Sequence, residues 1–370
     1  MIGVTSSPQT LCAGMANSNI LTPEETREFL GKLFNLPETT LTIEVARSCN
    51  LRCRGCWVGI SRHDLWTSEI SSVIDDSLLN RALSLGRNLA IDKLGLVGGE
   101  PTLHPNLGGI IRQARAMGYK SISVTTNGVV SAKRLCEIIS SGIANISFSI
   151  DGSHPELHNR LRPSPNGKDT FHITMRNLEF AMANSRMFGY EVRVNNTVYA
   201  GNAHDTESLV RFLSQKGVKK IRLHFTMPED LDVGVHISPS HWLELYAKLK
   251  CLAEELDIQL MMQPVYGSEA LSQARFRKSP YMHLQPDGNL ILCAAYARLT
   301  DSRKRSFAFI QDEQRISVNP QFFASGPETN AVCCHGVPKL IRQMPKELRH
   351  QAYKHGMGCI ILQSPISGEL

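Results

Sequence analysis

The chain has 370 residues, a formal net charge of +6 and 42% hydrophobic residues. This length and apolar content suit one large globular domain with a smaller one attached. No apolar stretch approaches the roughly 18 residues that span a membrane, which argues against a membrane protein. The first twenty residues contain no Lys or Arg, so they lack the basic segment of a secretory signal, and we expect a cytoplasmic protein. No run of five basic residues occurs, which argues against a dedicated nucleic-acid binder.

Residues 1–39 are predicted to form a polar arm followed by one helix. Thr22-Pro23-Glu24-Glu25 has the form of a capping box, with proline at the first helical position. It predicts a helix that ends near Leu36.

Three cysteines follow the first predicted strand at the spacing C-x-x-x-C-x-x-C. Cys49, Cys53 and Cys56 lie on one short loop, and three such thiolates can bind three irons of a cubane cluster. The fourth iron then stays open to another ligand, as in catalytic rather than structural metal sites. Two other interpretations are open at this point: a chance grouping of cysteines, and a zinc site with His63 as its fourth ligand.

From residue 40 onward, strand and helix patterns alternate along the chain. Strands are predicted at 40–47, 92–98, 120–126, 145–150, 190–199 and 219–226. Helices are predicted at 69–86, 106–117, 131–141, 169–187, 203–216 and 239–256. This alternation predicts parallel βα units with right-handed crossovers. We therefore expect an α/β fold, a partial (β/α)6 TIM-like barrel over residues 40–230, and a linking helix region over 231–264.

Several of these strands alternate between apolar and polar residues, whereas strands covered on both faces are usually apolar throughout. Helices must cover the apolar side, so the polar side is expected to line the inside of the barrel and to enclose a polar ligand. This parity makes Arg193, Asn195, Arg222 and His224 the candidate catalytic or substrate-binding residues. An inward charge needs a partner, so the arginines indicate a substrate carboxylate or phosphate. His224 could donate or accept a proton, or be a structural histidine.

Residues 265–370 differ in character and are predicted to form a small cysteine-containing C-terminal extension. A hairpin pattern within residues 282–293 has its turn at Asp287-Gly288. The cysteines available in this region are Cys293, Cys333, Cys334 and Cys359. They could bind a second iron–sulfur cluster, bind zinc together with His335, or stay as inert or redox-paired thiols.

The cysteine loop and three later motifs resemble the radical S-adenosylmethionine (SAM) superfamily. Gly98-Gly99-Glu100-Pro101, Thr126-Asn127-Gly128 and Ser149-Ile150-Asp151-Gly152 match family landmarks in the expected order. The family often has an aromatic residue just before the third cysteine. This chain has Gly55 there, and Trp57 follows the cysteine instead.

The C-terminal hairpin resembles the one that opens the auxiliary-cluster extension of many radical SAM enzymes, called SPASM or twitch. One position departs from that pattern, because Ser279-Pro280-Tyr281 stands where the family usually has a cysteine. The resemblance implies that the C-terminal cysteines bind a second cluster.

The resemblance also implies a [4Fe–4S] cluster on the three cysteines of the loop, with SAM on its open iron. An electron from a flavodoxin- or ferredoxin-type donor would then cleave SAM to methionine and a 5′-deoxyadenosyl radical, which abstracts hydrogen from the substrate. The residues implied to bind SAM are Trp57, Gly98, Gly99, Glu100, Asn127, Ser149, Asp151 and Arg160, with nearby Arg162 as a further candidate.

The expected function is that of a biosynthetic radical SAM enzyme that oxidises or rearranges a polar small molecule or a peptide. Only about 40 residues precede the first strand. They are too few for the peptide-recognition domain of many peptide-modifying relatives, which favours a small molecule. A SPASM-type peptide maturase is one alternative. A non-catalytic electron carrier or SAM sensor is a second, and an RNA-modifying enzyme is a third.

Overall fold

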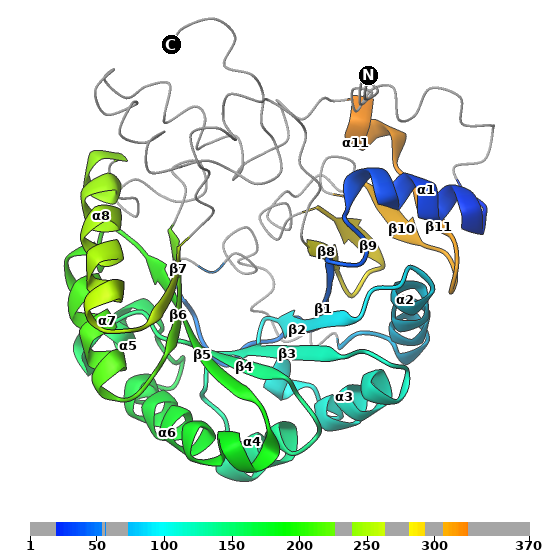
Figure 1. Cartoon of the computed structure of the whole chain (residues 1–370). Helices are drawn as coiled ribbons and strands as arrows, with labels where there is room; N and C mark the ends of the chain where they lie inside the picture. The colour runs from blue at the N-terminus through cyan, green and yellow to red at the C-terminus, as the bar shows by residue number, and fades with distance from the viewer. Residues whose placement is uncertain are drawn as a thin grey trace, which may run out of the picture.

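One curved sheet organises the molecule, as the computed structural model shows (Figure 1). The structure describes residues 20–53, 56, 73–225, 239–262, 281–292 and 306–324. In these ranges the strand order is β11-β10-β9-β8-β1-β2-β3-β4-β5-β6-β7. The strands are β1 (Thr40–Ala46), β2 (Lys93–Gly98), β3 (Ser121–Thr126), β4 (Asn145–Ser149), β5 (Glu191–Val198), β6 (Lys220–Phe225), β7 (Gln259–Met262), β8 (Tyr281–Leu284), β9 (Asn289–Ile291), β10 (Ala308–Ile310) and β11 (Ile316–Val318).

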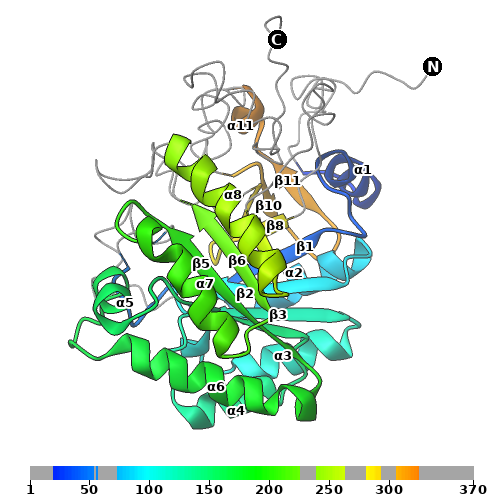
Figure 2. The same ribbon diagram turned by 60° about the vertical axis from the view of Figure 1, so that its left-hand side comes forward.

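Strands β1 to β7 are all parallel to their neighbours, and helices cover their convex side. Figure 2 shows α7 and α8 in front of β5 and β6. The predicted partial barrel is therefore confirmed. The helices are α1 (Pro23–Leu33), α2 (Asp76–Asn88), α3 (Leu107–Ala116), α4 (Ala132–Ile139), α5 (Pro155–Leu161), α6 (Thr170–Phe188), α7 (Thr206–Gln215), α8 (Pro239–Glu255) and α11 (Pro320–Ala324), with short 3₁₀ turns η3 (Pro101–Leu103) and η4 (Ala203–Asp205).

Capping residues set where the helices begin. The Thr22–Glu25 capping box is present, but α1 ends at Leu33, three residues before the predicted end. Helix α2 begins at Asp76 rather than at residue 69, because the Asp75 carboxylate accepts hydrogen bonds from the backbone N–H groups of Ser77 (2.9 Å) and Leu78 (3.0 Å).

The predicted strand alternation places the core under the helices. Apolar residues of β2 to β6 are buried in one cluster with helix side chains such as Ile110, Leu135, Leu178 and Leu209. The strand residues are Leu94, Leu96, Ile122, Val124, Ile146, Phe148, Val194, Val198, Ile221 and Leu223. Arg222 and His224 on β6 are only partly buried and lie on the opposite, concave side. Asn196 breaks the pattern: it shares the apolar face and is fully buried, and its amide donates to the Ile150 carbonyl at 3.1 Å.

The C-terminal segment extends the same sheet at its other edge. Strand β8 pairs in parallel with β1, and β8 and β9 form the predicted antiparallel hairpin. Strands β7, β10 and β11 were not predicted. No helix within the described ranges is both long and apolar enough to cross a membrane.

Candidate active site

The three cysteines lie where β1 ends, at the edge of the sheet where parallel strands usually place ligands. All three are free thiols and partly buried. Their loop is fixed from two sides. The Asn50 side chain donates to the Val129 carbonyl at 2.7 Å, and the Arg52 N–H donates to the Pro163 carbonyl at 2.8 Å.

Asn127, at the end of β3, touches the loop directly. Its amide nitrogen lies 2.8 Å from the Asn50 side-chain oxygen and 3.7 Å from the Cys49 sulfur. The Leu51 backbone N–H also points at the Cys49 sulfur, at 3.4 Å. These two weak donors favour a negatively charged sulfur at this position.

Burial works against that charge. It raises the pKa of the Cys49 thiol well above its usual value and raises that of Cys53 to about 12, although the Arg162 guanidinium opposes the shift at Cys53. The thiols of Cys49 and Cys53 are therefore protonated at neutral pH in the free protein. A cationic metal cluster supplies the positive charge that buried thiolates need, so this donor set fits such a group.

Gly98 and Gly99 allow β2 to approach the segment that leads into the cysteine loop. The Gly99 N–H donates to the Ala46 carbonyl at 2.7 Å, and the Glu100 N–H donates to the Ser48 carbonyl at 2.9 Å. A Cβ at Gly98 would lie 2.0 Å from the Ala46 carbonyl oxygen, and one at Gly99 would lie 2.3 Å from the Arg47 oxygen. Both glycines thus allow close contact between two backbone segments of the protein.

The Glu100 carboxylate is buried among protein donors. It accepts from the Thr102 N–H (3.1 Å), the Thr126 hydroxyl (2.7 Å) and the Asn127 N–H (2.7 Å). Burial raises its pKa, and these hydrogen bonds partly offset the increase. An ionised carboxylate offers about four acceptor positions, so three donors leave room for one more. Glu100 both supports the ends of β2 and β3 and retains capacity for a ligand.

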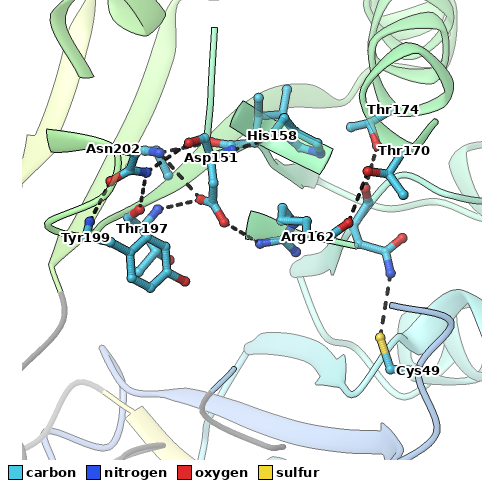
Figure 3. A network of polar contacts seen from close by, with 12 residues as sticks. Cys49, Asp151, His158, Arg162, Thr170, Thr174, Thr197, Tyr199 and Asn202 are labelled. Atoms are coloured by element: carbon cyan, nitrogen blue, oxygen red, sulfur yellow. Dashed lines mark hydrogen bonds and ion pairs between the residues drawn. The ribbon is translucent and has the colours of Figure 1, made fainter. Parts of the chain in front are cut away.

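Asp151, just beyond β4, organises the opposite side of the site (Figure 3). Its carboxylate accepts from the Thr197 N–H at 2.8 Å and from Arg162 Nη1 at 2.8 Å. Its carbonyl accepts from the Asn202 amide at 2.9 Å, and Asn202 in turn accepts from the Tyr199 N–H at 2.6 Å. Through these contacts Asp151 orients Arg162.

Arg162, and not Arg160, is the arginine that reaches this site. Arg160 is exposed on α5. Arg162 caps the end of that helix, and its guanidinium turns inward to Asp151 and interacts electrostatically with Cys53. Its Nε is buried and has no hydrogen-bond partner within the described part of the chain. A guanidinium with an unused donor beside the cysteine loop suits an anionic ligand group.

The predicted substrate-side residues divide into two groups. Asn195 and Arg222 are in register across β5 and β6 on the concave side, and His224 follows two residues further along β6 on the same side. Ser149, which was predicted to bind SAM, is in register with Asn195. Arg193 lies nearer the start of β5 and forms an ion pair with Glu191 at 2.5 Å, so its charge has a partner within the protein.

Residues 43–213 match the family model described as the radical SAM superfamily. This match places residues 43–213 of the chain in the radical SAM superfamily. The matched range contains the cysteine loop and the network around Asp151, and it ends before Arg222.

Curated relatives match about half of this chain. GTP 3′,8-cyclase of Aquifex aeolicus is 29% identical over 201 residues, which cover 54% of this chain and 58% of the relative. The AdoMet-dependent heme synthase of Oleidesulfovibrio alaskensis is 25% identical over 185 residues, which cover 50% and 45%. The chain thus spans about half the length of the curated relatives it matches.

Solved structures agree on the fold. Native anSMEcpe with bound AdoMet superposes with a TM-score of 0.60 at 19% identity, covering 78% of this chain and 81% of that one. SuiB of Streptococcus suis, bound to the precursor peptide SuiA, gives a TM-score of 0.59 at 12% identity, covering 88% and 72%. At these identities the similarity concerns the fold alone.

Several predicted ligands lie outside the described residues, namely Trp57, Cys293, Cys333, Cys334 and Cys359. The adenine contact and the second cluster therefore remain predictions. Within the described ranges, no three His, Cys, Asp or Glu side chains are grouped as ligands of a single metal ion.

Sequence reasoning missed the residues that support the site from behind. Asn50, Thr197 and Asn202 act through hydrogen bonds that join segments far apart in the chain, and the Tyr199 N–H supports Asn202 locally. No local pattern indicates such partners. Only the position of Thr197 near the end of a predicted strand could have indicated that it lies close to the site.

Proposed function

We propose that this chain is a radical SAM enzyme that holds a [4Fe–4S] cluster on Cys49, Cys53 and Cys56 and SAM beside it. The observation that carries the proposal is the arrangement of this edge of the sheet. Three free thiols lie on one loop, and one of them, Cys53, interacts electrostatically with the guanidinium of Arg162, which Asp151 holds in place at 2.8 Å. The cluster and SAM, when bound, supply one-electron cleavage of SAM and a radical able to abstract hydrogen from an unactivated carbon.

The chain's own residues would position these groups. Asn127 and the Leu51 N–H support the Cys49 sulfur through the contacts described above. Arg162 would bind the SAM carboxylate with the donors that Asp151 leaves unused. Glu100 would accept from the SAM ammonium group at its remaining acceptor position. Ser149 stays a candidate for the ribose or carboxylate of SAM.

For the substrate, we infer a polar small molecule, acted on by oxidation or rearrangement in a biosynthetic pathway. Two matching relatives are named for GTP cyclisation and heme synthesis, which supports a small molecule. SuiB has been solved with a precursor peptide, and peptide maturation is therefore the second candidate. A flavodoxin- or ferredoxin-type donor would supply the electron. We infer a cytoplasmic setting, because a reducing compartment keeps the cysteines available for metal.

The test compares iron content and SAM cleavage in wild type, in one triple-cysteine variant and in one double-cysteine control variant. After anaerobic reconstitution, the variant Cys49→Ala/Cys53→Ala/Cys56→Ala should hold about four irons per chain fewer than wild type. It should also fail to form 5′-deoxyadenosine under reduction. The matched control is Cys136→Ala/Cys251→Ala, which removes two exposed thiols away from the loop. Its iron content and activity should equal those of wild type.

Two results would overturn the proposal. One is equal iron in wild type and in the loop variant. The other is a fully loaded, reduced wild type that makes no 5′-deoxyadenosine with candidate substrates present, which would favour a non-catalytic carrier or sensor. A wild-type content of about eight irons that falls to about four in the loop variant would add the second cluster to the proposal.

A further inference from the structure

Strand β6 carries three basic side chains on its concave side: Lys220, Arg222 and His224. They alternate along the strand, so they point in the same direction. At the start of the strand the charge is balanced within the protein. Glu191, on neighbouring β5, forms ion pairs with both Lys220 and Arg193.

Arg222, one step further along the strand, has no such partner. Within the described ranges its guanidinium forms no ion pair, and its one side-chain hydrogen bond is to the Met261 sulfur at 4.0 Å. Taking a guanidinium partly out of water without an anion is costly. Within the described part of the chain Arg222 is thus a cation without a counter-charge, two residues from Lys220, whose charge is paired with Glu191.

His224 adds a neutral donor beside this cation. Its imidazole makes no hydrogen bond to another described residue, and it is partly buried. Burial lowers the pKa of His224 to about 4, and the charge of Arg222 contributes in the same direction. At neutral pH the imidazole is uncharged, so it carries one N–H donor and one acceptor.

On the β5 side the neighbours of Arg222 are polar and lie close to the proposed SAM site. Arg222 is in register with Asn195, which is in register with Ser149, and His224 is in register with Thr197. The Thr197 N–H is itself bonded to the Asp151 carboxylate at 2.8 Å. A group bound at Arg222 would thus sit one strand away from the network that holds Arg162.

We propose that Arg222, assisted by His224 and Asn195, binds the anionic group of the substrate, a carboxylate or a phosphate. This inference rests on the proposed function, because it assigns a substrate-binding residue on the same concave side of the sheet. Arg222 supplies the charge and a planar pair of donors that matches either anion. Arg193, although predicted alongside it, serves the scaffold through Glu191.

The experiment measures anion binding to the reconstituted, SAM-saturated protein by calorimetry, at fixed ionic strength because salt screens such contacts. The titrants are inorganic pyrophosphate and glutarate, which separate a phosphate site from a carboxylate site. Arg222→Gln should weaken binding of the preferred anion by about ten-fold or more. The matched control, Arg193→Gln, removes an equally oriented guanidinium from the neighbouring strand and should change the affinity by less than about three-fold.

Equal affinity in wild type and Arg222→Gln would overturn the proposal. So would the absence of binding of both titrants to wild type at about 20 mM, since that concentration exceeds a weak millimolar Kd severalfold. Iron content and 5′-deoxyadenosine formation by wild type, measured on the same preparation, test the proposed function separately. A wild-type protein that shows no cluster chemistry but still binds anions through Arg222 would contradict the proposed function and support the anion site.

Discussion

Glu44 on β1 and His283 on β8 are hydrogen-bonded across a buried junction, with Oε1 and Nε2 2.8 Å apart. They are 239 residues apart in the chain, and both side chains are almost fully buried. Arg47 lies 3.7 Å from the Glu44 carboxylate and 3.4 Å from that of Asp287 in the hairpin turn. The hairpin is thus joined to the strand that leads directly into the cysteine loop.

We expect His283→Leu to lower the free energy of unfolding by about 1–3 kcal/mol, because it leaves the Glu44 carboxylate without its nearest partner. Urea denaturation of His283→Leu, Glu44→Met and the double variant gives the coupling energy of the pair. The double variant should be more stable than the sum of the two single losses implies. Strictly additive losses would show that the two side chains do not stabilise one another.

Gly99→Ala should destabilise the protein by about 1–3 kcal/mol, since the new methyl group would overlap the carbonyl oxygens of Arg47 and Ser48, and backbone cannot yield as a flexible side chain can. The loss should appear in the metal-free protein. Gly201→Ala is the matched control, because a Cβ there meets no atom within 4 Å. It should stay within about 0.5 kcal/mol of wild type. A Gly99→Ala protein as stable as the control would contradict the close packing described here.

How much of this could be read from the sequence depends on the range of the interactions. Six parallel strands were predictable because each carries its own apolar periodicity and is followed by a helix. Strand β7 is a four-residue segment, too short for a period to show, and its place in the sheet comes from pairing with β6. The pairing of β8 with β1 joins distant segments, and no local pattern indicates it.

The choice between Arg160 and Arg162 shows the same limit at the site. Both arginines fall at the end of a short helix, and the sequence does not reveal which one turns inward. In the structure the helix ends at Leu161, and Arg162 leaves helical geometry with φ −124° and ψ 58°, which directs its side chain to Asp151. The position of a helix end is set to within a residue by capping and packing, and sequence patterns do not reach that precision.

Asn127→Asp should weaken retention of the cluster by about 10- to 100-fold, because it replaces the amide donor near Cys49 with a second negative charge. Iron per chain after gel filtration measures the retention, and electron paramagnetic resonance of the reduced cluster measures its midpoint potential. That potential should become more negative, since nearby negative charge disfavours the added electron. Asn184→Asp, on the distant part of α6, is the matched control and should behave as wild type. Unchanged retention and potential in Asn127→Asp would show that the contact with Cys49 has no influence on the cluster.

His158 should make the protein sensitive to acid. Its imidazole is fully buried, accepts from the Asp151 N–H at 3.3 Å, and has its pKa lowered by burial from 6.5 to about 3. Between these two pH values the unfolded chain binds a proton that the folded protein does not, so the free energy of unfolding decreases as the pH falls from about 6.5 toward 3. Above about pH 6.5 this contribution is constant.

In His158→Asn the side-chain oxygen can still accept from Asp151, and no proton is taken up. Urea midpoints measured between pH 7.5 and 4.5 should therefore fall less steeply for this variant than for wild type. Thr174→Val, which removes a buried hydrogen bond to the Asn127 carbonyl but no titratable group, should lower all midpoints by a similar amount and leave the slope unchanged. A His158→Asn slope equal to that of wild type would show that this imidazole takes up its proton in the folded protein as readily as in the unfolded chain.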